Sequence, residues 1–197
     1  MSRVSGRYGS RLVSPEALDS VLEELWSPVV ALTAAHEGRA NGLISSTVVT
    51  ASILPESPRI AVVLSCEHRT HELVLASGAF AVHLLPAEPL ERSLEIFRTL
   101  GFQSGHSADK LAAIPWRPGT THAPLLNEAV AYAEARVART LDADDVTVVL
   151  ADVVSAERLR DVRHLTIDDV RAHLTEDDWA AWEARRADEI RHARSLR

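Results

Sequence analysis

Residues 42–58 read GLISSTVVTASILPESP, and this stretch decides the predicted fold. Its β-branched residues predict a strand over 43–52, which ends at a turn rich in proline. The strand carries an unusual number of hydroxyl side chains, at Ser45, Ser46, Thr47, Thr50 and Ser52. Either these hydroxyls face solvent on a half-exposed strand, or they line a polar groove that holds a ligand.

Five further runs rich in β-branched residues accompany this strand. They are PVVALTAA at 28–35, RIAVVLS at 59–65, FAVHLL at 80–85, AVAYAEARVART at 129–140 and VTVVLADVVS at 146–155. The segment HEGRANG joins the first two strands, and its Gly38 and Asn41-Gly42 suit a tight hairpin. Six strands with few helices between them, several joined by hairpins, predict a mostly antiparallel barrel.

Helices are expected between and before the strands. Ser14 as N-cap and Pro15 at the first helical position predict a helix over 15–26. Thr70 as N-cap and Gly78 as C-cap predict a second, short helix, and a third is expected over 88–100. Residues 101–128 are rich in Gly, Pro, Ser and His, which predicts a long functional loop.

The composition becomes strongly charged after residue 158. We therefore expect a domain over 1–158 and a C-terminal helical extension over 159–197. Thr166 with Asp169, and Thr175 with Asp178, resemble capping boxes at two helix starts. The last helix is expected over 176–195, with Trp179 and Trp182 docking it onto the barrel or onto a partner subunit.

The overall composition excludes several classes of protein. The chain has 197 residues and a formal net charge of −7, which argues against a protein that coats nucleic acid or a membrane surface. Cys66 is the only cysteine, so an intramolecular disulfide and a cysteine-based zinc site are both excluded. No apolar run is long enough to span a membrane, and the start of the chain does not look like a signal peptide. We expect a cytoplasmic protein.

The loop SCEHRTHE, residues 65–72, is a candidate anion site. It follows a strand and opens a helix, so free amide groups and the positive end of the helix dipole face it. Arg69, His68 and His71 add cationic side chains, and Ser65 and Thr70 add hydroxyl groups. The alternative is an ordinary helix start with solvated charges around it.

Two other functions of this loop are weaker hypotheses. His68 and His71 have metal-ligand spacing, but no third ligand accompanies them at a defined spacing. Cys66 lies beside cationic residues that would lower a thiol pKa. Because no base-and-orienter pair accompanies it, a small buried thiol is the simpler interpretation.

The stretch GLISSTVVTASILPESP resembles, at the same spacing, the glycine, hydroxyl-pair, serine and proline pattern of the flavin reductase-like family. This is the FMN-binding split-barrel family of short-chain flavin:NAD(P)H oxidoreductases. The strand RIAVVLS, the polar loop and the helix ending in ASGAFAVHLL are also similar. DKLAAIPW, Gly119, Pro124-Leu125 and AYAEARV then follow in the family's order, so the resemblance covers about residues 27–155.

This resemblance implies a mainly β protein, a six-stranded antiparallel split β-barrel with a few flanking helices. Such proteins are usually homodimers with FMN, or FAD, near the dimer interface. By position, the flavin ring and ribityl chain would lie along Ile44, Ser45, Ser46 and Thr47, with Ser52 near the ribityl chain. Ser65, Arg69 and Thr70 would bind the phosphate. Asn41, Cys66 and His71 complete the expected cofactor-binding set.

The implied function is hydride transfer from NADH or NADPH to flavin, with reduced flavin passing to a partner monooxygenase. No acid–base residue is required, because the cofactor does the chemistry. Asp144, Asp145 and Val146 stand where many relatives carry Gly-Asp-His, and Ile44 replaces a commoner threonine. These departures favour an alternative, a flavin-binding split barrel without free-flavin reductase activity. His106 or His122 could approach the flavin instead of the missing histidine. A cofactor-free dimerisation domain is a third hypothesis, which the hydroxyl strand and the Arg69 loop argue against.

Overall fold

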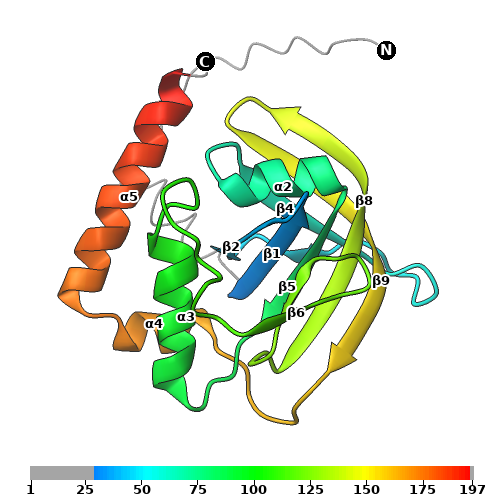
Figure 1. The fold of residues 1–197 in the computed structure, drawn as a ribbon, viewed down its shortest axis with the longest axis horizontal. Helices are drawn as coiled ribbons and strands as arrows, with labels where there is room; N and C mark the ends of the chain where they lie inside the picture. The colour runs from blue at the N-terminus through cyan, green and yellow to red at the C-terminus, as the bar shows by residue number, and fades with distance from the viewer. Residues whose placement is uncertain (1–28, 196–197) are drawn as a thin grey trace.

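A computed structural model describes residues 29–195 (Figure 1). The strands are β1 (Val30–His36), β2 (Arg39–Ser45), β3 (Val49–Thr50), β4 (Arg59–Ser65), β5 (Ala79–Leu84), β6 (Trp116–Pro118), β7 (Pro124–Leu126), β8 (Ala131–Ala143) and β9 (Val146–Arg158). The helices are α2 (Arg69–Ser77), α3 (Leu90–Phe102), α4 (Ile167–His173) and α5 (Glu176–Ser195). The helix expected over 15–26 lies outside the described residues. The mainly β class and the C-terminal helices predicted from the sequence are confirmed.

One large antiparallel sheet dominates the fold. Its strand order is β2-β1-β5-β8-β9-β4-β3, and β6 pairs with β7 in a separate small sheet. The large sheet has seven strands, where the sequence predicted six. Figure 1 shows the sheet curling around an interior that α2 covers at one end, while α3 and α5 lie side by side against one flank.

The extra strand arises because the predicted strand over 43–52 breaks after Ser45. The hydroxyl oxygen of Ser45 accepts the N–H of Thr47 at 3.2 Å. The Thr47 hydroxyl donates to the carbonyl of Val63 at 3.0 Å and accepts its N–H at 3.3 Å. These side-chain bonds replace backbone ladder bonds, so the chain leaves β1 and joins β4. Because β2 and β3 are the end strands of the sheet, residues 46–48 connect its two edges and close the split barrel.

The hairpin predicted at HEGRANG is confirmed, but its turn is not at Asn41-Gly42. His36 pairs with Arg39, which leaves Glu37 and Gly38 as a two-residue turn. Their φ angles are 49° and 75°, and a type I′ turn requires positive φ at both central positions. This turn closes the hairpin early, so Asn41 and Gly42 lie inside β2.

The predicted short helix is α2, and its C-cap is confirmed while its N-cap is not. Gly78 has a φ of 65° and donates its N–H to the carbonyl of Val74. The helix begins at Arg69, one residue before the predicted cap, and His68 is the N-cap. Thr70 is therefore in the first turn, where it is buried.

Mostly aliphatic side chains form three buried clusters among residues 29–195, in line with an aromatic content of only 5%. The first fills the barrel and includes Leu32, Val62 and Phe80. The second lies between the sheet and helices α3 and α4, and includes Ile96 and Leu126. Each fully buried side chain of this size contributes roughly 1.5–3 kcal/mol, so the second cluster fixes α3 firmly on the barrel.

The C-terminal helices are capped and tied down as the sequence predicts. Thr166 and Asp169 form a reciprocal capping box, and so do Thr175 and Asp178. Arg98 of α3 donates two hydrogen bonds of 2.8 Å to Asp178, which lowers the pKa of that carboxyl group. No helix within residues 29–195 is long and apolar enough to cross a membrane.

The predicted loop over 101–128 contains β6 and β7, which the sequence analysis missed. A buried carboxylate holds the turn between them. Glu134 accepts the N–H and hydroxyl of Thr121, both at 2.7 Å, and the N–H of Thr120 at 3.1 Å. Burial opposes ionisation, but these hydrogen bonds keep the pKa of Glu134 below its usual value. Gly119 packs directly against the carboxylate.

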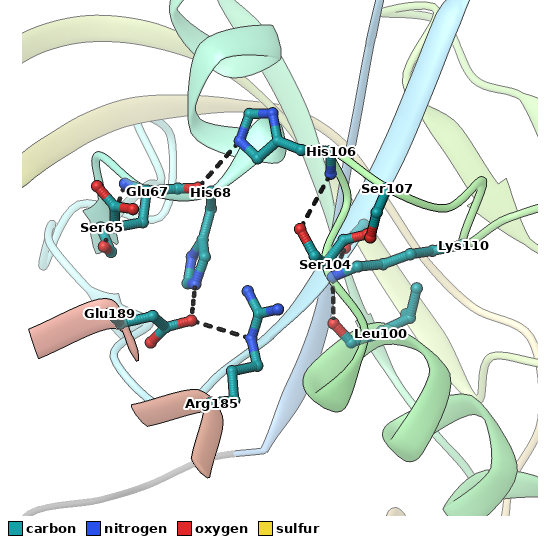
Figure 2. Close-up of polar contacts among 11 residues, drawn as sticks. Ser65, Glu67, His68, Leu100, Ser104, His106, Ser107, Lys110, Arg185 and Glu189 are labelled. Carbon is teal, nitrogen blue, oxygen red and sulfur yellow. Dashed lines mark hydrogen bonds and ion pairs between the residues drawn. The ribbon is translucent and has the colours of Figure 1, made fainter. Parts of the chain in front are cut away.

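A buried lysine anchors the middle of the same loop. Lys110 is 4% exposed and donates to the carbonyls of Leu100 at 2.7 Å and Gly42 at 3.2 Å. It thereby joins the end of α3 to β2 (Figure 2). Burial, with a smaller contribution from nearby Arg185, lowers the pKa of Lys110 to about 8.

Replacing Gly119 with alanine is expected to destabilise the protein by about 2–4 kcal/mol, because a displaced Glu134 leaves buried donors unpaired. A Cβ atom at Gly119 would lie 2.3 Å from Glu134 Oε1. Gly101→Ala is the control, since its Cβ would meet Ile44 Cγ1 at an ordinary 3.5 Å. The measurement is urea unfolding, and equal midpoints for the two variants would contradict the prediction.

Lys110→Met is expected to remove a pH-dependent part of the stability. The pKa of Lys110 is about 8 in the folded chain and 10.5 in the unfolded chain. Between these values the unfolded chain binds more protons, so wild-type stability gains up to about 1 kcal/mol per pH unit as pH rises. The wild-type free energy of unfolding minus that of the variant should therefore increase from pH 8 to pH 10. A pH-independent difference in urea unfolding would show that Lys110 does not titrate in this range.

Candidate functional site

The crossover segment and the end of β2 form one wall of a hollow of about 280 Å³. Ile44 and Ser46 line it from this side, and Phe97 and Phe102 line it from α3. On this side its surface is apolar, with a hydroxyl group and a stretch of strand backbone at one edge, while charged side chains line the opposite side.

The other two hydroxyls predicted here, those of Ser45 and Thr47, do not line this hollow. Their oxygen atoms lie 3.1 Å apart, and both groups hold the crossover in shape. Of these three hydroxyl residues, Ser46 thus lines the hollow, while Ser45 and Thr47 fix the backbone that forms its wall.

The predicted anion loop lies directly beside this hollow, because His68 lines it and also caps α2. The hydroxyl oxygen of Ser65 accepts the N–H of Glu67 at 3.3 Å, which turns the chain toward the helix. The side chain of Arg69 pairs with Glu72 in the first turn. The first amide groups of α2 and the positive end of its dipole point at this loop.

Cys66 and His71 belong to the anion loop but do not line the 280 Å³ hollow. His71 is 8% exposed, and its Nε2 lies 2.9 Å from the hydroxyl of Thr147 on β9. Burial lowers the pKa of His71, so it is neutral at pH 7. The Cys66 thiol is half-buried, 4.0 Å from His71 Nε2. Among residues 29–195, no three His, Cys, Asp or Glu side chains form a cluster that could hold a metal ion.

Asn41 and Ser52 are placed very differently. Asn41 is buried, accepts the N–H of Gly42 at 2.7 Å and donates to the carbonyl of Gly105 at 3.1 Å. It therefore joins β2 to the long loop and lines a second hollow, of about 630 Å³, together with Arg69. Ser52 accepts the N–H of Leu54 in an exposed turn and lines neither hollow.

Helix α5 supplies site residues that the sequence analysis missed. Trp182, Arg185 and Glu189 line the 280 Å³ hollow opposite Ile44 and Ser46. Figure 2 shows Glu189 between His68 and Arg185, with its Oε1 atom 3.1 Å from His68 Nε2 and 3.0 Å from Arg185 Nε. No local motif marks these residues, because they reach the site only through the docking of α5 on α3.

The charges here are paired across the helix–loop contact. Burial disfavours an ionised Glu189, but hydrogen bonds from His68 and Arg185 outweigh it and lower the pKa of Glu189. His192 Nε2 also lies 2.9 Å from a carboxylate oxygen of Glu67. Two histidine–carboxylate contacts, one from each side, therefore join the anion loop to α5.

Of the two alternative histidines, only His106 lies at the loop. Its Nε2 is 3.1 Å from the carbonyl of Glu67, and it lines the 630 Å³ hollow (Figure 2). His122 is exposed in the turn held by Glu134 and lines none of these hollows. Val146 pairs with Ser65, so this position too lies beside the anion loop.

The arrangement suits a ligand that has a flat apolar part and an anionic end. The apolar hollow would take the first, and the cationic side chains with the α2 amides would take the second. Cys66 and His71 do not line the apolar hollow, and the residues that do line it include no nucleophile paired with a base, so the site is suited to binding a reactive group rather than supplying one.

Comparison with known proteins agrees with this chemistry. The family described as "Flavin reductase like domain" matches residues 22–171. The ferric-chelate reductase (NAD(P)H) of Archaeoglobus fulgidus is 34% identical over 139 residues, which cover 70% of this chain and 79% of that protein. HsaB of Mycobacterium tuberculosis, the reductase subunit of a flavin-dependent monooxygenase, is 25% identical over 154 residues, 78% of each chain.

A solved structure shows the same fold. The NADH:FAD oxidoreductase of Streptomyces globisporus superposes with a TM-score of 0.66 at 22% identity, over 79% of this chain and 90% of that chain. The family match ends at residue 171, so α5 lies outside it. Because the match spans most of the chain, including the crossover and the anion loop, the chain belongs to the flavin reductase-like domain family.

Proposed function

We propose that this protein binds FMN and transfers hydride to it from NADH or NADPH, acting as a flavin reductase. The observation that carries the proposal is the junction of two surfaces at one residue. His68 lines the apolar hollow that Ile44 and Ser46 border, and it also precedes the first amides of α2. A flavin mononucleotide needs these surfaces in this order, one for its ring system and one for its phosphate.

The residues present fit this cofactor. Ile44, Phe97 and Phe102 offer apolar surface to a ring, and Ser46 offers a hydroxyl group to its polar edge. Arg69 and the start of α2 would bind the phosphate, together with Ser65 and Thr70. When bound, the flavin supplies the redox chemistry by accepting hydride. The protein's residues bind it, orient it and limit water access, so their contribution is positioning.

FMN is favoured over FAD because one helix N-terminus with one arginine matches one terminal phosphate. FAD is the alternative, since the Streptomyces globisporus neighbour is named for it. The relative from Mycobacterium tuberculosis is the reductase subunit of a monooxygenase. By analogy, reduced flavin from this protein would supply a partner monooxygenase.

A second function is favoured by one position. Val146 pairs with Ser65 beside the anion loop, and a valine offers no hydrogen bond to a nicotinamide. The alternative is therefore a flavin-binding protein that does not turn over free NAD(P)H. Its binding residues would be the same.

The assembly we propose is a cytoplasmic homodimer in which residues 159–197 extend a barrel domain over 1–158. Exposed apolar residues support dimerisation. Ile53 is 96% exposed, and Val49 and Leu54 are each more than half exposed. Val49 and Ile60 also line an apolar hollow of about 270 Å³. A two-fold arrangement would cover this surface on both copies.

Purified protein with added FMN is expected to oxidise NADH or NADPH faster than a protein-free control containing the same flavin. The assay follows nicotinamide absorbance, with FMN binding measured in parallel by quenching of flavin fluorescence. If FMN binds but neither NADH nor NADPH is oxidised, the protein has the second function, flavin binding without turnover of free NAD(P)H. Absence of binding would reject both.

Arg69→Ala is expected to weaken FMN binding about tenfold, because a charge-assisted contact to the phosphate is lost. Riboflavin, which lacks the phosphate, should bind both proteins equally. Arg59→Ala is the matched control, since Arg59 pairs with Asp152 on the exposed sheet. Fluorescence titration gives all the affinities. An unchanged FMN affinity in Arg69→Ala would remove this residue from the phosphate site.

A further inference from the structure

Helix α5 brings a carboxylate to the anion loop from outside the family match. The Oε1 atom of Glu189 lies 3.1 Å from His68 Nε2 and 3.0 Å from Arg185 Nε (Figure 2). The side chains of all three residues are less than 30% exposed. The ion pair of Arg185 with Glu189 is stronger in so sheltered a place than it would be at the open surface.

This carboxylate stands where the hollows around the loop meet. A hollow of about 510 Å³ between α5 and the anion loop is lined by Glu67, His106 and His192. It shares Arg185 and Glu189 with the 280 Å³ hollow at Ile44 and Ser46. The ion pair between Arg185 and Glu189 therefore forms a wall between the two spaces.

A ligand phosphate that binds at this loop would lie close to the carboxylate of Glu189. His68 directly precedes α2, and its Nε2 already donates to a carboxylate. A phosphate that approaches the α2 amides brings a charge of about −1.5 to −2 toward that carboxylate, and like charges at this distance repel strongly. The two anions would compete at His68, which lies between Glu189 and the first amides of α2.

We propose that Glu189 occupies the anion site in place of the ligand's phosphate, and so sets the affinity for phosphate-bearing flavins. The inference rests on the proposed function for the identity of the ligand. When the phosphate binds, His68 exchanges the carboxylate of Glu189 for the phosphate. By linkage, phosphate binding then loosens the docking of α5, and the docking of α5 weakens phosphate binding by the same factor.

Riboflavin separates this effect from any general change in the pocket. It carries no phosphate, so its binding does not require displacement of Glu189. Glu189→Gln keeps the shape of the side chain and removes its charge. Asp188→Asn is the matched control, because it removes a charge from the same 510 Å³ hollow at an exposed residue of α5 that pairs with Arg191.

The first experiment titrates FMN and riboflavin into wild type, Glu189→Gln and Asp188→Asn by flavin fluorescence quenching. Glu189→Gln is expected to bind FMN about tenfold more tightly than wild type, with riboflavin affinity unchanged. Asp188→Asn should stay within about twofold of wild type for both ligands. Weaker or unchanged FMN binding in Glu189→Gln would overturn the proposal, as would an equal gain for riboflavin.

A second experiment tests the displacement without a flavin. Hydrogen exchange of residues 176–195 is measured in inorganic phosphate and in sodium chloride of equal ionic strength. Phosphate is expected to speed exchange in wild type, and to have no effect in Glu189→Gln. Unchanged or slower exchange in wild type overturns the proposal. If no flavin binds to any variant, the proposed function fails, and the phosphate measurement still decides the role of Glu189.

Discussion

The crossover over residues 46–48 carries the chain from one edge of the sheet to the other, and the rest of the structure depends on its path. The hydroxyl of Thr47 hydrogen-bonds to both the carbonyl and the N–H of Val63, and the hydroxyl of Ser45 accepts the N–H of Thr47. Without these bonds, residues 46–48 would leave backbone groups unpaired between β2 and β4. Closure of the barrel and the position of the main hollow both depend on this crossover, since Ile44 and Ser46 flank it.

The rest of the site is arranged around that closed edge. α3 packs on the sheet through the second apolar cluster, and its aromatic residues face the crossover. α5 then docks on α3 through Arg98 and Asp178, which brings its charged face over the anion loop. A barrel belonging to a widespread family thereby acquires one wall that the family match does not include.

Local chemistry made most of the fold and half of the site predictable. The β-branched runs located the strands, Gly78 ended α2, and the threonine–aspartate pairs started α4 and α5. The break after Ser45 was not predictable from periodicity, because Thr47 bonds to a residue 16 positions away. β6 and β7 were missed for a similar reason, since a buried Glu134 holds their turn from another strand.

The residues of α5 at the site were beyond any sequence pattern. Glu189 and His68 are 121 positions apart, and only the docking of helices brings them together. Ser52 shows the opposite case. Its position matches the family pattern, but its hydroxyl accepts a hydrogen bond in an exposed turn and does not reach the site. Composition and spacing thus predict which functional side chains the protein carries, and packing determines which of those side chains come together.

Lys110 has a practical consequence for chemical probing of this protein. It is the only lysine in the chain, and its amine is buried and bonded to two carbonyl groups. Amine-directed acylating or cross-linking reagents therefore find no accessible lysine side chain on the native fold. Modification of Lys110 would occur only after the segment around it detaches from β2. The rate of acylation at this one residue would thus report how often the long loop detaches from β2 and α3.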